Sequence, residues 1–305
     1  MTARHLLSIT DLSPEEIGKL IQRAMDMKRG PRTTPLAGKS IALLFEKPSL
    51  RTKLSFDVGI TQLGGHAVYM GRDEVGLGGR EPVADVARVL SRYVDAVVAR
   101  VFSHKSLVEM ARHSAVPVIN ALSDEEHPCQ TLADLQTIHD HKGRLQGLTI
   151  AFIGDGNNVS ASLALGAASV GAHFVIASPA GYELTPETVA RAKRLASANE
   201  SSIRLVRRPQ EAVEGADVVY TDVWVSMGDE AETAARLPAF QGYQVDPELI
   251  RLANKGAIFL HDLPAHQGQE ISAGMLEHPQ SVVFDQAENR LHAQKAVLEM
   301  LLGSA

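Results

Sequence analysis

The sequence is poor in cysteine and has no long apolar segment. Its 305 residues include one cysteine, Cys129, which excludes an internal disulfide and is typical of a reducing compartment. No apolar run approaches the ~20 residues of a membrane span. The first residues, Met1 to His5, lack the apolar core of a signal peptide. We therefore expect a cytoplasmic protein with no membrane partner.

The chain also has no excess of basic residues. The chain has 36 acidic and 30 basic residues, a net charge of −6, which argues against nucleic acid as a general partner but allows a local basic site for a small anion. Hydrophobic residues make up 45% and charged residues 22%, as in ordinary globular proteins, and the length suffices for two domains.

Apolar stretches alternate with helical patterns in units of roughly 30 residues, which predicts α/β folding around parallel, doubly wound sheets. We expect two Rossmann-like domains joined by interdomain helices: residues 1–142 and 143–285, with a last helix at 286–305 packing back onto the first domain. The expected strands lie at 41–45, 67–70, 96–101, 116–122, 148–153, 173–177, 203–206, 218–221, 257–260 and 282–284.

A polar, cationic stretch follows the first expected strand. Ser49, Arg51 and Thr52 precede a helical pattern, so they should lie at a helix N-terminus, where unpaired N–H groups and the helix dipole favour an anion. Their hydroxyls and guanidinium are donors of the kind that hold phosphate. Taken alone, such a stretch is more often only an N-capping serine beside a solvated arginine.

The turn after the strand at 148–153 resembles the start of a dinucleotide fingerprint. Gly154 and Gly156 match its first two glycines, but Val159 stands where the third belongs. A two-glycine match is weak evidence for NAD. We expect the glycines to permit the turn and to leave two asparagine amides at the carboxyl edge of the sheet, where an open α/β sheet binds its ligand.

Further polar groups fall at expected strand ends or helix starts. Arg100 ends an apolar strand, although a lone arginine there is often solvated. His127 and Gln130 lie about one helical turn apart, although a histidine before proline is often a helix cap. Asp222 leaves another strand and can instead bond its own backbone in a turn. The remaining groups are 224–228, 261–264 and 288–290.

In this order and spacing the segments resemble the ornithine carbamoyltransferase family over essentially the whole chain. The family's S-T-R-T-R, H-P-x-Q, D-x-W-x-S-M-G and H-C-L-P motifs correspond to residues 49–53, 127–130, 222–228 and 261–264. Segments 153–158, 240–244 and 287–290 are also similar to family segments.

The resemblance implies transfer of the carbamoyl group of carbamoyl phosphate to the δ-amine of L-ornithine, giving citrulline and phosphate without a cofactor or metal. It also implies a homotrimer or multiple of trimers, and a place in arginine biosynthesis or in the corresponding catabolic route. The implied carbamoyl-phosphate residues are Ser49, Leu50 through its backbone, Arg51, Thr52, Arg100, His127, Gln130, Leu263 and Arg290. The implied ornithine residues are Asn158, Asp222, Ser226, Met227 and Asp262, and the catalytic residues are Arg51, Arg100, His127 and Asp262.

The chain departs from the family pattern at several positions. Leu50 and Lys53 replace the threonine and arginine of the phosphate motif; the first position can act through its N–H, and Lys53 keeps the charge but loses the planar fork. Gly76 stands where the family often has a glutamine or histidine donated to a neighbouring subunit. Asp262 replaces the motif cysteine beside the reacting amine, changing the local charge by one unit.

Asp262 has two expected effects. It can pair with the ornithine ammonium, which strengthens binding but keeps the amine protonated, or it can accept the amine's proton if desolvation raises its own pKa. We favour the first.

The alternatives for the whole chain are a sister carbamoyltransferase acting on N-acetylornithine, putrescine or aspartate, a weakly active paralogue, and a nucleotide-binding oxidoreductase resting on Gly154 and Gly156.

Overall fold

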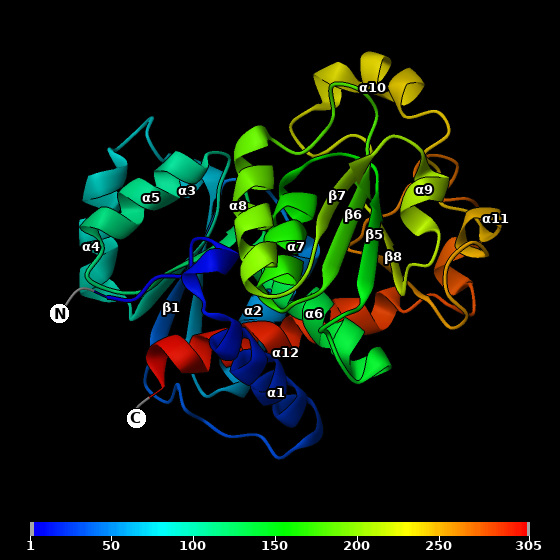
Figure 1. Ribbon diagram of the computed structural model, residues 1–305. Coiled ribbons are helices and arrows are strands. Elements are labelled where there is room, and N and C mark those ends of the chain that lie inside the picture. Colours follow the sequence, from blue (N-terminus) through cyan, green and yellow to red (C-terminus); the bar gives the residue numbers. More distant parts are fainter. Residues whose placement is uncertain (1–2, 304–305) are drawn as a thin grey trace. The chain divides into compact units, whose positions relative to one another are not determined.

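The computed structural model describes residues 3–303, so Met1 and Thr2 of the N-terminal stretch considered above lie outside it. The chain divides into two compact units, each built around a parallel sheet (Figure 1). Unit 1 comprises Met1–Gln136 with Glu288–Ala305, and unit 2 comprises Thr137–Ala287. The expected α/β class with two parallel sheets flanked by helices is confirmed.

Unit 1 contains a four-stranded sheet of order β2-β1-β3-β4, in which every neighbouring pair is parallel. The strands are β1 (Ser40–Phe45), β2 (His66–Gly71), β3 (Ala96–Arg100) and β4 (Val118–Leu122). The helices that begin in this unit are η1 (Ile9–Asp11), α1 (Pro14–Arg29), α2 (Leu50–Gln62), α3 (Arg72–Val75), α4 (Val83–Tyr93), α5 (His104–His113) and α6 (Pro128–Lys142).

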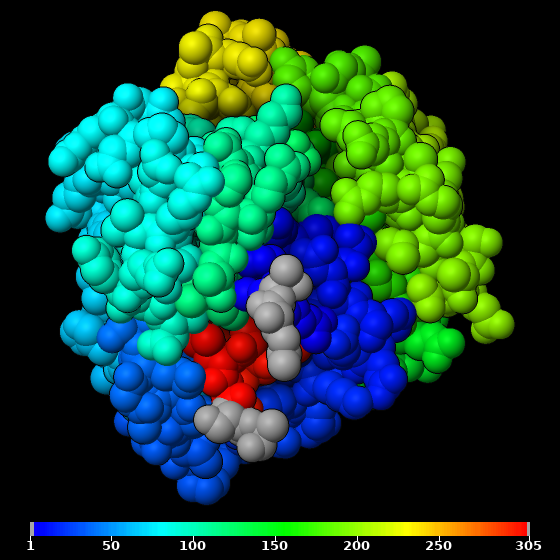
Figure 2. Space-filling view, turned by 90° about the vertical axis from the view of Figure 1, so that its left-hand side faces the viewer, coloured from blue at the N-terminus to red at the C-terminus, as the bar shows by residue number. Residues whose placement is uncertain are grey.

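Both ends of the chain contribute to unit 1. Helix α1 begins with a capping box, in which Ser13 accepts from the Glu16 N–H and the Glu16 carboxylate accepts from the Ser13 N–H. Arg23 of α1 pairs with Glu299 of the last helix, α12 (Val283–Leu302), through a 2.6 Å contact of Nε with Oε2. Figure 2 shows atoms of α12, in red, between the blue segments of the first 50 residues.

Unit 2 contains a five-stranded parallel sheet of order β7-β6-β5-β8-β9. The strands are β5 (Thr149–Ile153), β6 (His173–Ala177), β7 (Ile203–Val206), β8 (Val218–Thr221) and β9 (Ile258–His261). The helices are α7 (Asn158–Ser169), α8 (Pro186–Ala198), α9 (Pro209–Val213), η2 (Glu230–Glu232), α10 (Thr233–Ala239), α11 (Pro247–Ile250) and η3 (Met275–Glu277). The strand order reverses between β5 and β8, and this switch point is the expected ligand crevice of an open α/β sheet.

The core of unit 2 follows the two-residue alternation of its strands. Ala151 and Ile153 of β5 face a buried cluster that includes Val213 of α9 and Ile250 of α11. The intervening Phe152 stacks on Tyr220 of β8, with ring centroids 5.3 Å apart. Both faces of β5 are therefore buried, which explains its continuous apolar sequence.

The strand expected at 282–284 is wrong. Val282 makes one strand-like bond, from its N–H to the Phe259 carbonyl (3.0 Å), but α12 begins at Val283. The β-branched and aromatic residues suggested a strand, whereas Val283 and Phe284 form the first turn of a long helix, with Val283 buried and Phe284 exposed. Within residues 3–303, no helix is long and apolar enough to cross a membrane.

Candidate active site

The predicted phosphate stretch forms the beginning of α2 in unit 1. Ser49 is the N-cap, and its Oγ accepts from the N–H of Thr52 (3.3 Å). The side chain of Leu50 is exposed, so only its backbone is placed to bind at this turn. From α12, Nη2 of Arg290 donates to Oγ1 of the buried Thr52 (2.6 Å). The structure thus adds a guanidinium from α12 to the helix N-terminus that carries Arg51.

Arg100 and His127 lie at the same edge of the sheet in unit 1. Arg100 ends β3 and pairs with Phe45, the last residue of β1, while His127 immediately precedes α6. Arg100 is 8% exposed, so it is not the solvated surface arginine that the sequence also allowed. Burial lowers the pKa of His127 well below its usual value, and the charges of Arg290 and Arg100 lower it further. His127 is therefore neutral at pH 7.

Gln130 is fixed by a residue that the sequence analysis missed. Its Nε2 donates to Oδ1 of Asp134, one turn further along α6 (2.8 Å), and both side chains are buried. Within residues 3–303, Oε1 of Gln130 has no hydrogen-bond partner. Because Asp134 accepts from Nε2 and fixes the direction of the amide, its carbonyl oxygen Oε1 remains as a buried acceptor. The i, i+4 spacing of a glutamine and an aspartate was the available sequence signal.

Aromatic rings hold several cations of unit 1. Lys53, which replaces the usual arginine of the phosphate motif, lies with Nζ 3.6 Å from the centroid of the Tyr69 ring. Lys47 and Arg72 lie 4.6 and 5.5 Å from the centroid of Phe102. Such contacts keep positive charge in place without a carboxylate. Lys47 and Arg72 were not predicted as site residues, because their approach to Phe102 depends on the fold.

In unit 2, Asp222 leaves β8 and is held by the turn after β5. Nδ2 of Asn157 donates to Oδ2 of Asp222 (2.7 Å), and the N–H of Val223 donates to Oδ1 (2.7 Å). Asn157 is also the N-cap of α7, and its Oδ1 accepts from the N–H of Val159 and of Ser160. The predicted residue Asn158 is the first of α7. The asparagine side chain that contacts Asp222 is therefore that of Asn157, which directly precedes the predicted site residue Asn158.

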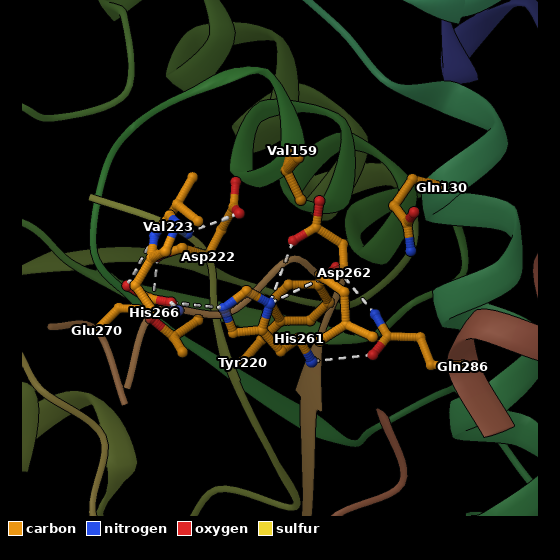
Figure 3. A network of polar contacts seen from close by, with 12 residues as sticks. Gln130, Val159, Tyr220, Asp222, Val223, His261, Asp262, His266, Glu270 and Gln286 are labelled. Carbon is orange, nitrogen blue, oxygen red and sulfur yellow. Dashed lines mark hydrogen bonds and ion pairs between the residues drawn. The ribbon is translucent and has the colours of Figure 1, made fainter. Parts of the chain in front are cut away.

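A buried network supports Asp262 and Leu263 after β9. Figure 3 shows its members His261, Asp262 and Glu270. Nδ1 of His261 accepts from the N–H of Leu263 (2.9 Å), so the ring proton lies on Nε2, which faces Oε1 of Glu270 (3.2 Å). The N–H of His266 also donates to Oε1 of Glu270. Leu263 has a φ of 59°, a costly conformation for a branched side chain, and the His261 contact holds it.

Asp222, His261 and Asp262 offer potential metal ligands within 4.8 Å of one another. Oδ1 of Asp262 lies 3.7 Å from Nδ1 of His261. However, both ring nitrogens of His261 already have partners, Leu263 and Glu270, so a metal at this nitrogen would displace the bond that holds the Leu263 backbone. In this arrangement His261 is therefore committed to Leu263 and Glu270 rather than to a metal ion.

The segment that carries Ser226 and Met227 is anchored at its base. Trp224 is buried and stacks on Phe240, with ring centroids 5.7 Å apart. Met227 is 48% exposed and Gly228 has a φ of 109°. Ser226 and Met227 are therefore carried on an exposed turn rather than in the core.

The turn containing Gly154 and Gly156 has a structural reason for its glycines. A Cβ at Gly156 would lie 2.2 Å from the backbone carbon of Glu183 and the backbone nitrogen of Leu184. The N–H of Gly156 also donates to the carbonyl of Tyr182 (2.8 Å). The segment before α8 thus packs against the turn, which supports the structural interpretation of the glycines.

The predicted residues fall into two groups. Those for carbamoyl phosphate belong to unit 1, except Leu263, and those for the amino acid belong to unit 2. In each unit they gather at the carboxyl edge of a parallel sheet, with a cationic, donor-rich group in unit 1 and carboxylates in unit 2. The fold is therefore that of an α/β protein with two parallel-sheet units, whose candidate residues differ in charge.

Comparison with known proteins gives the family. The carbamoyl-phosphate binding domain of aspartate/ornithine carbamoyltransferase matches residues 4–140, and its Asp/Orn binding domain matches residues 146–301. The chain belongs to the aspartate/ornithine carbamoyltransferase family.

Individual relatives match along the whole chain. The ornithine carbamoyltransferase of Archaeoglobus fulgidus is 51% identical over 304 residues, which cover 98% of each chain. That of Acidothermus cellulolyticus is 52% identical over 306 residues, covering 99% of this chain and 97% of the relative. The structure of ornithine carbamoyltransferase from Pyrococcus furiosus has a TM-score of 0.96 and 45% identity, and covers 100% of this chain and 98% of that one.

Proposed function

We propose that the chain is an ornithine carbamoyltransferase, which transfers the carbamoyl group of carbamoyl phosphate directly to the δ-amine of L-ornithine. The observation that carries the proposal is the buried acceptor of Gln130, fixed by Asp134 in the same unit as Arg100, His127 and Arg290. A carbamoyl group presents an N–H₂ donor and a carbonyl oxygen, and its phosphate is an anion. Unit 1 supplies an acceptor for the N–H₂ group, and donors for the carbonyl oxygen and the phosphate.

The residues of unit 1 have distinct roles in this reaction. The α2 N-terminus, Arg51 and Thr52 bind the phosphate, and Arg290 assists through its bond to Thr52. Negative charge develops on the carbonyl oxygen as the amine attacks and then passes to the leaving phosphate. Arg100 and neutral His127 donate to that oxygen, which lowers the barrier. Accordingly, residues up to 142 form the carbamoyl-phosphate domain, with the helix from 286 packed on it.

The residues of unit 2 bind the amino acid. Asp222 accepts the α-ammonium, while Asn158, Ser226 and Met227 contact the α-amino and carboxylate groups, so residues 143–285 form the ornithine domain. Asp262 pairs with the δ-ammonium and raises its pKa, because an opposite charge favours the charged form. The amine reacts only after losing its proton, so turnover rises with pH through the pKa of the bound amine. Leu263 contacts the carbamoyl group through its backbone.

We also propose that the enzyme is a homotrimer or a multiple of trimers. An apolar stripe on α2, formed by Leu50, Leu54 and Val58, is exposed, as are Val68 and Tyr69 of the edge strand β2. Such a face is a site for another copy of the chain. Gly76 offers no side chain to a neighbour's phosphate site, so that contact is either lost or made by a nearby residue. The buried free Cys129 agrees with a reducing, cytoplasmic location, and we place the enzyme in arginine biosynthesis on its likeness to the family.

The test is steady-state carbamoyl transfer from carbamoyl phosphate with four acceptors compared: ornithine, N-acetylornithine, putrescine and aspartate. We expect turnover with ornithine and at most a small fraction of it with the others. Preferential turnover of another acceptor would support a sister carbamoyltransferase instead. Binding of carbamoyl phosphate without turnover of any acceptor would indicate an inactive paralogue.

A further inference from the structure

Arg236 of α10 joins three separate segments of unit 2. Its Nη1 donates to Oδ2 of Asp155 (2.7 Å) in the turn after β5, and to the carbonyl of Trp224 (3.2 Å) after β8. Its Nε donates to Oε2 of Glu232 (2.9 Å), and Nη2 lies 3.6 Å from Oδ2 of Asp229. Although it is an arginine, its side chain is only 10% exposed.

These contacts hold both ends of the segment that carries Ser226 and Met227. Trp224 precedes the two residues, and Asp229 follows them directly after Gly228. The planar guanidinium therefore fixes the separation between the two ends of the turn and ties both to the turn after β5. That same turn carries Asn157, which bonds Asp222.

We propose that Arg236 is a positioning residue for the amino-acid site, which sets the Trp224–Gly228 turn relative to Asp222 through its bonds to Asp155, the Trp224 carbonyl and Asp229. The inference rests on the proposed function, because it takes the ligand of this turn to be ornithine. Arg236 itself does not contact the substrate.

The charges around this arginine link its contacts to the ligand. Burial raises the pKa of Asp155 to about 6, Arg236 opposes that rise, and the negative charges of Asp222 and Asp229 add to it. A ligand ammonium at Asp222 cancels one of the repulsive charges and favours ionised Asp155, which is the form that pairs with Arg236. By linkage, ornithine binds more weakly as the pH falls through about 6.

The experiment compares Arg236→Gln and Arg236→Lys with the wild-type enzyme. We expect Arg236→Gln to raise the KM for ornithine by ~10–100-fold, the usual effect of losing bonds to charged groups, and to leave the KM for carbamoyl phosphate unchanged. Arg236→Lys keeps the charge but not the fork, so its KM should be intermediate. The matched control is Arg251→Gln, because Arg251 is an exposed arginine that pairs with Glu248 outside this network.

Trp224 is the only tryptophan of the chain, so its fluorescence reports on the turn without requiring turnover. In Arg236→Gln we expect emission at longer wavelength, because the buried indole becomes more exposed, and a weaker response to ornithine. Asp155→Asn should keep the fold, raise the ornithine dissociation constant less than Arg236→Gln does, and remove the pH dependence of binding near pH 6.

Ornithine binding in Arg236→Gln that matches the wild type, with only a lower melting temperature, would overturn the inference and leave a purely structural arginine. That result differs from failure of the proposed function, which would appear in the wild type as absence of carbamoyl transfer to ornithine. If the wild type binds ornithine without turnover, the fluorescence titrations still decide the role of Arg236.

Discussion

The side chain of Gln130 donates from Nε2 to the carboxylate of Asp134, 2.8 Å away, in the buried part of α6. This contact determines which end of the amide is available to a ligand. It holds Nε2 against Asp134 and leaves Oε1 as the buried acceptor, and the N–H₂ group of carbamoyl phosphate needs an acceptor.

Asp134→Asn tests this orientation. An asparagine can donate as well as accept, so the Gln130 amide loses its fixed direction, and we predict a rise in the KM for carbamoyl phosphate of about 5–100-fold with the KM for ornithine unchanged. The matched control is Asp26→Asn on α1, where Gln22 makes the same i, i+4 contact (2.9 Å) on the surface. Equal effects of the two substitutions would contradict the proposed orientation.

His127→Gln tests the role of the neutral histidine. Loss of a donor to the developing oxyanion predicts a fall in kcat of about 10²–10³-fold. The pKa of His127 is lowered well below 6.5, so this residue is neutral near pH 7. The pH profile of wild-type kcat should therefore show no titration of His127 between pH 7 and 8. Steady-state kinetics over that range check both points, and a kcat within a few-fold of the wild type would exclude a catalytic His127.

The same histidine contributes to the pH dependence of stability. Below about pH 6.5 the unfolded chain binds a proton at His127 that the folded chain does not, so this residue makes the protein less stable as pH falls. We predict that the free energy of unfolding of His127→Gln falls less between pH 7 and pH 5 than that of the wild type. Urea unfolding at the two pH values measures this difference, and identical falls would contradict the lowered pKa.

Asp262→Cys tests the effect of the carboxylate in the family's cysteine position. Removing this charge should lower the pKa of the bound δ-amine by about 1–3 units, so the rise of kcat with pH moves to lower pH and turnover at pH 7 increases, while the KM for ornithine rises. Asp262→Asn removes the charge at nearly constant volume and should shift the profile in the same direction. An unchanged pH profile in both variants would rule out pairing of Asp262 with the amine.

Gly156→Ala tests the close approach of the chain at the turn after β5. The new Cβ would lie 2.2 Å from backbone atoms of Glu183 and Leu184, so the backbone must move, and we predict a loss of about 1–3 kcal/mol or more in the free energy of unfolding. The contrasting control is Gly18→Ala in α1, where the Cβ meets nothing within 4 Å and should stabilise the helix by about 0.5–1 kcal/mol. Destabilisation by both substitutions alike would contradict the steric account.

Much of the fold could be predicted because the apolar strands are continuous and the connections are helical. Parallel strands place their carboxyl ends at one edge, and the structure has Arg100 opposite Phe45 at the ends of β3 and β1, with Thr52 and His127 in the same unit. The start of α12 was missed because Val282, Val283 and Phe284 favour a strand locally, and the helix pattern became clear only beyond them.

The residues that orient the site were harder to predict, because most of them act across the fold. Asn157 reaches Asp222 over a separation of 65 positions, and Arg236 reaches Asp155 over 81. Neither pair lies at the short spacing of a helix or strand, so no local sequence pattern predicts its contact. Asp134 is different, since it lies four residues from Gln130 on one helix and was accessible to a sequence argument.

The central claim is that the carbamoyl group of carbamoyl phosphate is transferred to the δ-amine of ornithine and not to its α-amine. The most direct measurement is ¹³C nuclear magnetic resonance of the product formed from ¹³C-carbamoyl phosphate and ornithine labelled with ¹⁵N at the δ position. The account predicts a citrulline carbonyl signal split by one bond to ¹⁵N, and no such splitting when the label is at the α-amine. A one-bond splitting only with the α label, or no labelled citrulline at all, would contradict it.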